Sequence, residues 1–527
     1  MSPERRPEAA PVTADVLEGR TGRAVVPEVE LSTSTPAATT GDGGGPGDGG
    51  GSMQRRVVSG ASWSAAGRLG GQGLQFLAGL VLARLLFPED FGLLASVYVI
   101  TGLTVIFFDM GLSQALVHRR TLDDRVMSTA FWFNAVGGLL FVGLLTLLGP
   151  LVADFFDDDR LRWITPLAGL SFALSLAVVH SALLQRDLRF KPLALTEIGA
   201  GLVNHSATVT AAALGMGPWA LLVGPPLQSL VVTGVLWRLT GWRPRLQFSG
   251  RDLRGLWAFS GGMLGFGVVN YAGRNMDNLL IGRFVGAAGL GLYNRAYNLM
   301  LLPLQQVGGV LGRVMFPALT AMGDDLGRVR AAYRRALRLM SFLTIPLLVG
   351  MAATAPALVA VLWGDRWEGT VPLLQLLCLA GLPQALSSSE GWLYQSQGRT
   401  TLMFGMGLVS TLGTVVAISV GLQHGVVGVA AGVLVSAYVV LPVNLFVACR
   451  VVGLASWRVY ADNARTVVSA ALMGGAVWGL PHLLDVPAST GWLLPVQVAL
   501  GVLVYLLLAL LLQRPLLAEL RHLRGRR

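Results

Sequence analysis

Residues 81–94 read VLARLLFPEDFGLL, and residues 280–293 read LIGRFVGAAGLGLY. In the first stretch Arg84 precedes Gly92 by eight positions, and in the second Arg283 precedes Gly291 by the same interval. The two copies lie 199 positions apart, and a leucine follows the glycine in both. A short motif that recurs once in each half of the chain indicates two structurally related halves.

The composition places this duplication in a membrane. The chain is 53% hydrophobic and only 13% charged, and its mean hydropathy is +0.61. A helix needs about 20 apolar residues to cross the hydrocarbon core, and about 14 stretches of the chain meet that need. They lie near 62–83, 91–111, 129–151, 163–184, 195–215, 218–238, 257–281, 290–315, 338–362, 371–392, 402–421, 425–448, 466–484 and 491–513. The predicted fold class is therefore an all-α, multi-pass membrane protein.

The basic residues predict how the chain is oriented. Loops on the cytoplasmic side of a membrane are enriched in Arg and Lys. With this segmentation, 27 basic residues lie on the side that holds both termini, and five lie on the other. We therefore expect a protein of the cytoplasmic membrane with both termini in the cytoplasm. Topology and anionic headgroups account for the net charge of +11, and nothing in it indicates nucleic acid binding.

The 199-residue offset maps the first span onto the seventh and predicts five regions. Residues 1–54 are a disordered cytoplasmic tail, 55–245 and 246–450 are six-helix bundles, 451–513 hold two additional helices, and 514–527 are a basic tail. An even number of helices per bundle relates the bundles by an axis along the membrane normal.

We expect neither a catalytic domain outside the membrane nor a metal site. Loops shorter than roughly 25 residues leave no room for a catalytic domain, so we expect no enzyme. Cys378 and Cys449 lie in apolar spans, which offers neither a disulfide framework nor a metal cluster. No cofactor is implied.

Two spans carry polar side chains on one helical face. The spacing i, i+4, i+7 places them there, and they are Arg68, Gln72 and Gln75 in the first span and Asn270, Arg274 and Asp277 in the seventh. Gln75 and Arg274 are matched positions of the repeat. Such groups are costly in a bilayer and are functional candidates. If the two stripes share a cavity, its cations and amides suit an anionic, sugar-bearing ligand such as a lipid-linked diphosphate.

Each candidate also has a structural interpretation. Arg274 and Asp277 could form an i, i+3 ion pair that only neutralises itself, and Arg68 could extend toward the headgroups. Glu197 and His205 are candidates for ion coupling, or for hydrogen bonds that pack helices.

We interpret the repeated motif itself as structural. We expect Arg84 and Arg283 to end their helices, where a cation complements the helix dipole and anchors the helix at the headgroups. Gly92 and Gly291 then allow a turn or close packing.

The motifs resemble one family. They are SGASWSAAGRLG at 59–70, LARLLFPEDFGLL at 82–94, FFDMGLSQALVHRR at 107–120, LLQRDLRF at 183–190, NMDNLLIGRFVGAAGLGLYNRAYNLM at 275–300, RVMFPALTAM at 313–322 and VLWGDRWEGTVPLLQLLCLAG at 361–381. Together they resemble the Wzx-type, colanic-acid-exporter-like flippases of the multidrug/oligosaccharidyl-lipid/polysaccharide superfamily. The resemblance implies two six-helix bundles around a cavity that opens alternately to each side. It also implies an undecaprenyl-diphosphate-linked oligosaccharide as cargo, with basic cavity residues holding the diphosphate. Arg68 and Arg274 are assigned to that role by the polar stripe and not by the family.

The predicted function is therefore that of a flippase for a lipid-linked oligosaccharide in extracellular, capsular or lipopolysaccharide synthesis. The alternatives are an ion-coupled multidrug exporter of the same superfamily, which should present acidic residues in its cavity, and a non-transporting scaffold of a glycan-synthesis complex. A membrane polymerase or ligase would need a large outer loop, which the segmentation lacks. The implied partners are membrane lipid, the lipid-linked cargo and glycan-assembly proteins, with a monomer as the transport unit.

Overall fold

The computed structural model describes residues 49–109, 116, 123–250, 271, 273–323, 325–487 and 489–513. The predicted site residue Asn270 lies outside these ranges. Regular structure in the described residues is helical throughout, and residues 54–527 form one compact unit. The expected all-α membrane fold is confirmed.

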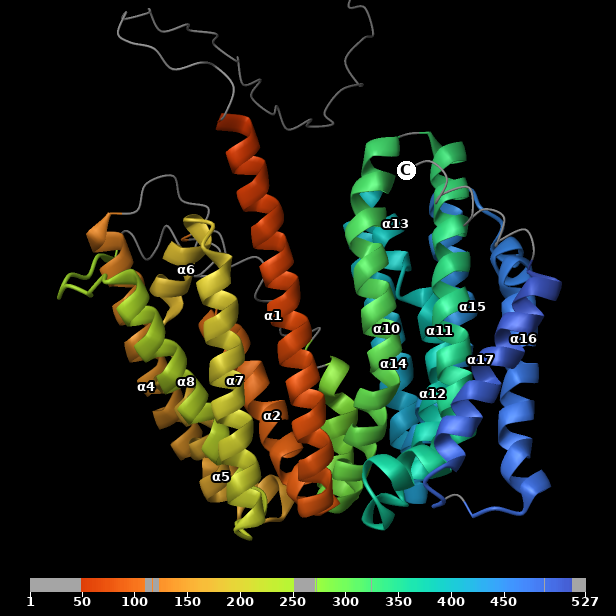
Figure 1. The fold of residues 1–527 in the computed structure, drawn as a ribbon, viewed down its shortest axis with the longest axis horizontal. Helices are drawn as coiled ribbons and strands as arrows, with labels where there is room; N and C mark the ends of the chain where they lie inside the picture. The colour runs from red at the N-terminus through yellow and green to blue at the C-terminus, as the bar shows by residue number, and fades with distance from the viewer. Residues whose placement is uncertain are drawn as a thin grey trace, which may run out of the picture. The chain divides into compact units, whose positions relative to one another are not determined.

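The helices fall into two groups by the contacts they make. The first group, red to yellow-green in Figure 1, comprises α1 (Gly49–Leu85), α2 (Pro88–Asp109), α4 (Asp124–Phe156), α5 (Leu161–Ala173), α6 (Val178–Arg186), α7 (Phe190–Ala213), the 3₁₀ turn η1 (Gly217–Trp219) and α8 (Ala220–Thr240). Within it α4 packs on α5, and α7 packs on α8.

The second group is green to blue in Figure 1. It comprises the helical residues 273–284, α10 (Ala287–Met322), α11 (Leu326–Leu362), η2 (Asp365–Trp367), α12 (Thr370–Ser387), α13 (Glu390–Ser396), α14 (Thr400–Gly421), η3 (Leu422–His424), α15 (Gly425–Val451), α16 (Ser456–Leu484) and α17 (Leu493–Leu512). Here α11 packs on α12 and α16, α14 packs on α15, and α16 packs on α17.

Nine helical stretches among the described residues are long and apolar enough to cross a membrane. Some of them join two predicted spans, as in Thr400–Val451, and other predicted spans extend beyond the described residues, so the count of 14 stays a prediction. Several helices begin well before the predicted spans: α1 at Gly49 and not near 62, α11 at Leu326 and not near 338, and α16 at Ser456 and not near 466. The predicted span 371–392 is divided between α12 and α13.

The predicted span 163–184 is broken into α5 and α6. The hydroxyl of Thr233 on α8 donates to the carbonyl of Leu174 at 3.0 Å and accepts from the amide of Leu176 at 3.2 Å. The indole of Trp237 donates to the carbonyl of Leu176 at 3.2 Å. A helix can break at membrane depth when neighbouring side chains satisfy the freed backbone groups, and here α8 supplies them.

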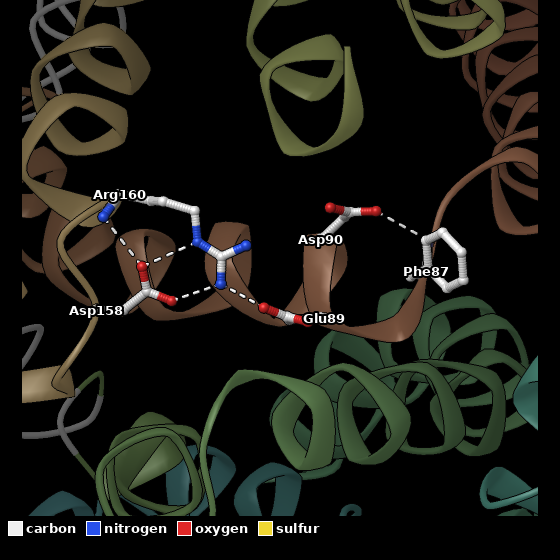
Figure 2. Close-up of polar contacts among 5 residues, drawn as sticks. All are labelled: Phe87, Glu89, Asp90, Asp158 and Arg160. Carbon is white, nitrogen blue, oxygen red and sulfur yellow. Dashed lines mark hydrogen bonds and ion pairs between the residues drawn. The ribbon is translucent and has the colours of Figure 1, made fainter. Parts of the chain in front are cut away.

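The start of α2 is encoded in the motif PEDFG. Pro88 is the first residue of the helix, and Glu89 and Asp90 lie in its first turn, where acidic side chains favour the helix dipole. The Asp90 carboxylate accepts the amide hydrogen of Phe87 at 2.9 Å (Figure 2). The turn between α1 and α2 is therefore closed by its own side chains.

The two groups meet where the two copies of the repeat touch each other, along α2 and α10. A Cβ added to Gly92 would lie 1.7 Å from the carbonyl oxygen of Ala287, and one added to Gly291 would lie 1.8 Å from that of Pro88. Ala287 is the repeat-related counterpart of Pro88, just as Gly291 is that of Gly92. The contact is therefore reciprocal, as expected for two copies packed about a two-fold axis.

Side chains on either side reinforce this junction, which we define as residues 83–92 together with 283–291 and 361–367. The Trp367 indole donates to the carbonyl of Ala83 at 2.7 Å, and Arg84 donates to the carbonyl of Val361 on α11. The guanidinium of Arg283 lies 5.8 Å from the ring centre of Phe155 on α4. Each repeat arginine thus reaches into the opposite group, a role that the expected headgroup anchoring did not include.

A small ion-pair cluster ties the start of α2 to the turn between α4 and α5 (Figure 2). The Arg160 guanidinium donates to both oxygens of Asp158, at 3.0 and 2.7 Å, and also to Glu89. These hydrogen bonds hold the pKa of Asp158 below its usual value. Because Arg160 and Glu89 are both partly exposed, we expect a contribution of about 0–1 kcal/mol.

Replacing either junction glycine should force α2 and α10 apart. We expect Gly92→Ala and Gly291→Ala each to destabilise the protein by about 1–3 kcal/mol, because backbone must move to admit the Cβ. Thermal unfolding of the purified protein measures the loss. Gly71→Ala on α1 is the control, because a Cβ there meets no atom within 4 Å. Equal stability of Gly92→Ala and Gly71→Ala would contradict the close contact.

The Asp158 cluster predicts a pH dependence. A carboxyl whose pKa is lower in the folded state stabilises the fold above its unfolded pKa of about 3.9, and that contribution is lost as the pH falls through the folded pKa. Asp158→Asn should therefore unfold at a lower temperature than the parent at neutral pH, and the gap should close in acid below about pH 4. Asp159→Asn serves as the control. A gap that persists unchanged in acid would contradict the ionic origin.

Candidate functional site

The polar stripe of α1 lies on an exposed face inside the membrane-spanning part of the helix. Arg68, Gln72 and Gln75 are all exposed. The side-chain oxygen of Gln72 accepts a hydrogen bond of 3.3 Å from the amide of Gln306 on α10. The partner of this stripe in the described residues is therefore α10 of the second group.

Polar side chains on α10 share one face. Arg295, Asn298, Gln306 and Arg313 recur at spacings that keep them within about a third of the helix circumference, and the last three are exposed. Together with the stripe on α1 they form the polar face of the two groups. Amides and guanidinium groups there can donate many hydrogen bonds to an anion.

Arg295 lies at the end of this face nearest the junction. Its guanidinium is 4.0 Å from the ring centre of Phe91 and 5.7 Å from that of Trp367. One terminal nitrogen lies 3.6 Å from the point where a Cβ of Gly79 on α1 would be. No ion pair of Arg295 is found among the described residues. An arginine held by aromatic rings and without a carboxylate keeps its donors available.

Arg295 was not among the predicted site residues, although the sequence holds a signal for it. The predicted polar stripes lie in the first and seventh spans, whereas Arg295 lies in the eighth. The spacing of Arg295, Gln306 and Arg313 in one apolar span would have identified the face.

Arg274 and Asp277 lie together in a different place, a pocket of about 300 Å³ inside the second group. Residues 273–284, α10, α12, α14 and α15 form its walls. Its other polar lining residues are Tyr293, Tyr297, Gln384, Ser387, Ser410, Thr411, Thr414, Ser436 and Asn444.

Asp277 is buried and has partners other than Arg274. Its carboxylate accepts from the Tyr293 hydroxyl at 3.0 Å and from the backbone amide of Asn278 at 2.8 Å. The ion pairs found among the described residues do not include Arg274 with Asp277. The self-neutralising interpretation is therefore not the arrangement in this structure, and the exposed Arg274 side chain faces the pocket.

The opposite wall of this pocket is a hydrogen-bonded network between α14 and α15. The amide of Asn444 donates to the Ser410 hydroxyl at 3.0 Å, and the hydroxyls of Thr414 and Ser436 lie 2.9 Å apart. Such groups satisfy one another across a helix interface in a membrane. The wall can exchange these bonds for bonds to a polar ligand or ion.

The ion-coupling candidates lie on α7, which packs along α1. The positive charge of Arg68 acts on Glu197, and a Cβ on Gly67 would lie 3.0 Å from the Ala194 side chain. Arg68 thus has an acidic neighbour on the adjacent helix. His205 is partly buried on the same helix. The transport roles of these residues stay predictions.

The chain is similar in sequence to proteins of polysaccharide biosynthesis. The model of the family described as "Polysaccharide biosynthesis protein" matches residues 81–372. The lipopolysaccharide biosynthesis protein WzxC of Escherichia coli (strain K12) is 28% identical over 420 residues, which are 78% of this chain and 84% of WzxC. The succinoglycan biosynthesis transport protein ExoT of Rhizobium meliloti (strain 1021) is 28% identical over 374 residues, 70% of this chain and 75% of ExoT.

Solved structures share the fold. The lipid II flippase MurJ in an inward closed conformation matches with a TM-score of 0.67 at 15% identity, over 87% of this chain and all of MurJ. An inward-facing multidrug resistance transporter of the MATE family matches with a TM-score of 0.53 at 14% identity, over 74% of this chain and 95% of that protein. Since the family model covers more than half of its residues, the chain belongs to the polysaccharide biosynthesis protein family.

Proposed function

We propose that this protein moves a lipid-linked oligosaccharide across the membrane by alternating access. The observation that carries the proposal is the polar, cationic face of α1 and α10. This face begins at the closed junction and runs along two helices that are otherwise apolar. Family membership and relatives named for lipopolysaccharide biosynthesis and succinoglycan transport support a cargo of this kind.

The chemistry of the face suits the diphosphate of such a cargo. A diphosphate needs several convergent donors, and guanidinium groups bind phosphate oxygens in pairs. Arg295 has no carboxylate partner among the described residues, and Arg68 lies on the facing helix. We assign the diphosphate to Arg295 and Arg68, with Arg274 in the adjoining pocket as the third candidate. The amides of Gln72, Gln75 and Gln306 then face the sugar.

The junction is suited to open and close. Its contacts include backbone packing at two glycines, an indole hydrogen bond, an arginine hydrogen bond and an apolar cluster in which Ala83, Phe91 and Ala95 pack with residues of the second group. Each hydrogen bond contributes about 1 kcal/mol net, so the free energy of cargo binding can offset the loss of these bonds. Because transport needs binding and movement only, no bond of the cargo is broken, and we propose no enzymatic activity.

We also propose the placement of the molecule. The arginine distribution supports a protein of the cytoplasmic membrane with both termini in the cytoplasm, so that the junction seals the outer side. Two six-helix bundles, 55–245 and 246–450, form the transport unit, which is complete in one chain, and helices within 451–513 are added to the second bundle.

One observation favours the second candidate, an ion-coupled exporter. Asp277 is a buried carboxyl beside a polar pocket, and intramembrane carboxyls mark ion pathways in transporters. The flippase remains preferred because the polar face of α1 and α10 carries three cations, Arg68, Arg295 and Arg313, whereas Asp277 lies in a separate pocket. Asp277 would serve as an ion-coupling group in either of the two transport mechanisms.

Removing a cargo-binding arginine should stop export without preventing folding. We expect Arg295→Ala and Arg274→Ala each to lower glycan export by about tenfold to a hundredfold, the loss expected for one charged hydrogen-bonding group. Complementation of a deletion strain measures export, and immunoblotting of membranes checks insertion. Arg238→Ala, at the exposed end of α8, is the control. Normal export by Arg295→Ala would remove that residue from the mechanism.

Loss of the gene should reveal the cargo. We expect a lipid-linked repeat unit to accumulate on the cytoplasmic leaflet, because synthesis continues while export stops. Extraction of lipid-linked intermediates followed by mass spectrometry identifies the sugar. Unchanged intermediates together with new sensitivity to cationic drugs would favour the multidrug exporter instead.

A further inference from the structure

A groove lies on the side of the second group, outside the polar face and the pocket of Asp277. It has a volume of about 890 Å³ and is lined by the start of α14 and the end of α15. Neither α1 nor α10 contributes to its lining. The groove is therefore separate from the residues to which we assign the cargo.

The two ends of this groove differ in chemistry. Arg399 and Arg450 line one end, and Leu402, Val409 and Val447 line the apolar wall. None of the described residues that line the groove is acidic. The ion pairs found among the described residues involve neither arginine. Two cations therefore face one space without a protein counterion.

The protein leaves the wall of the groove uncovered. The described residues of α14 that are buried are Ile418 and Gly421, which lie at the opposite end of the helix from Arg399. Val409 is 55% exposed. An apolar helix surface with so little packing inside a membrane protein is in contact with acyl chains.

We propose that this groove binds one anionic phospholipid, with the headgroup phosphate between Arg399 and Arg450 and the acyl chains along α14 and α15. Basic pockets between helices at the cytoplasmic face bind anionic headgroups in this way, and both arginines lie at the end assigned to the cytoplasm. The lipid bridges the start of α14 and the end of α15, beside the core cluster in which Met403 and Met406 pack with Leu445 and Cys449. It thereby holds α14, a wall of the Asp277 pocket, in place. This site is independent of the proposed transport function.

The test measures lipid retention by the full-length protein. The protein is purified, exchanged into mixed phosphatidylglycerol and phosphatidylcholine micelles, and analysed by native mass spectrometry. We expect wild type to retain phosphatidylglycerol in preference to phosphatidylcholine. Arg399→Gln with Arg450→Gln should bind phosphatidylglycerol about tenfold to thirtyfold more weakly.

Two further variants separate the groove from bulk charge and from misfolding. Arg238→Gln with Arg458→Gln removes the same charge from exposed positions outside the groove and should retain phosphatidylglycerol like wild type. Gly405→Leu fills the groove without removing charge, and it should fold because a Cβ at Gly405 meets no atom within 4 Å. We expect it to lose the lipid.

Three results would overturn the proposal. The first is equal loss of phosphatidylglycerol by the two double variants, which would assign the preference to bulk charge. The second is competition by inorganic phosphate alone, which would show a simple anion site that does not need acyl chains. The third is displacement of phosphatidylglycerol by undecaprenyl diphosphate, both from wild type and from the Arg68→Gln variant. That result would assign the groove to the cargo.

Discussion

The approach of one backbone to another at Gly92 and Gly291 is the constraint on which the rest of this structure depends. At either position a side chain would occupy the place of the opposite carbonyl oxygen. Because the helices touch through backbone, α2 and α10 come close enough for Trp367 to reach Ala83 and for Arg295 to reach Phe91. The polar face begins directly behind this contact. The spacing of the two groups is thus set by the absence of two Cβ atoms.

The polar residues within the helices fall into two classes with different energetics. Asp277 and the network of Ser410 with Asn444 are satisfied by other protein groups, so they add polar character to the pocket at little cost. The exposed cation Arg274 has no ion pair among the described residues, and the desolvation of such a group is costly in a bilayer. A protein keeps such groups where water or an anionic ligand reaches them. This contrast, more than the number of polar residues, points to the binding face.

The arginines of the chain have different structural roles. Arg84 and Arg283 join the two groups at the junction, Arg160 braces the start of α2, and Arg295 is presented to the polar face. Their neighbours differ: Arg84 donates to a backbone carbonyl and Arg160 to carboxylates, whereas Arg283 and Arg295 lie over aromatic rings. A rigid guanidinium with five donors can fill each of these roles, which suits a chain that contains a single lysine, Lys191.

The sequence by itself determined the membrane class, the apolar stretches that become helices and the existence of the repeat, because hydrophobic length and motif spacing are properties of local sequence. It also determined which side chains share a face on one helix, such as Arg68 with Gln72. It did not determine where α1 and α11 begin or that one span is broken into α5 and α6. Only the tertiary structure decided which helix lies opposite. Gln72 meets Gln306 of α10, whereas the seventh helix turns Asp277 into a pocket of its own group. Helical periodicity defines the face of a helix but carries no information about its partner, and long-range packing at the glycine contact selected that partner.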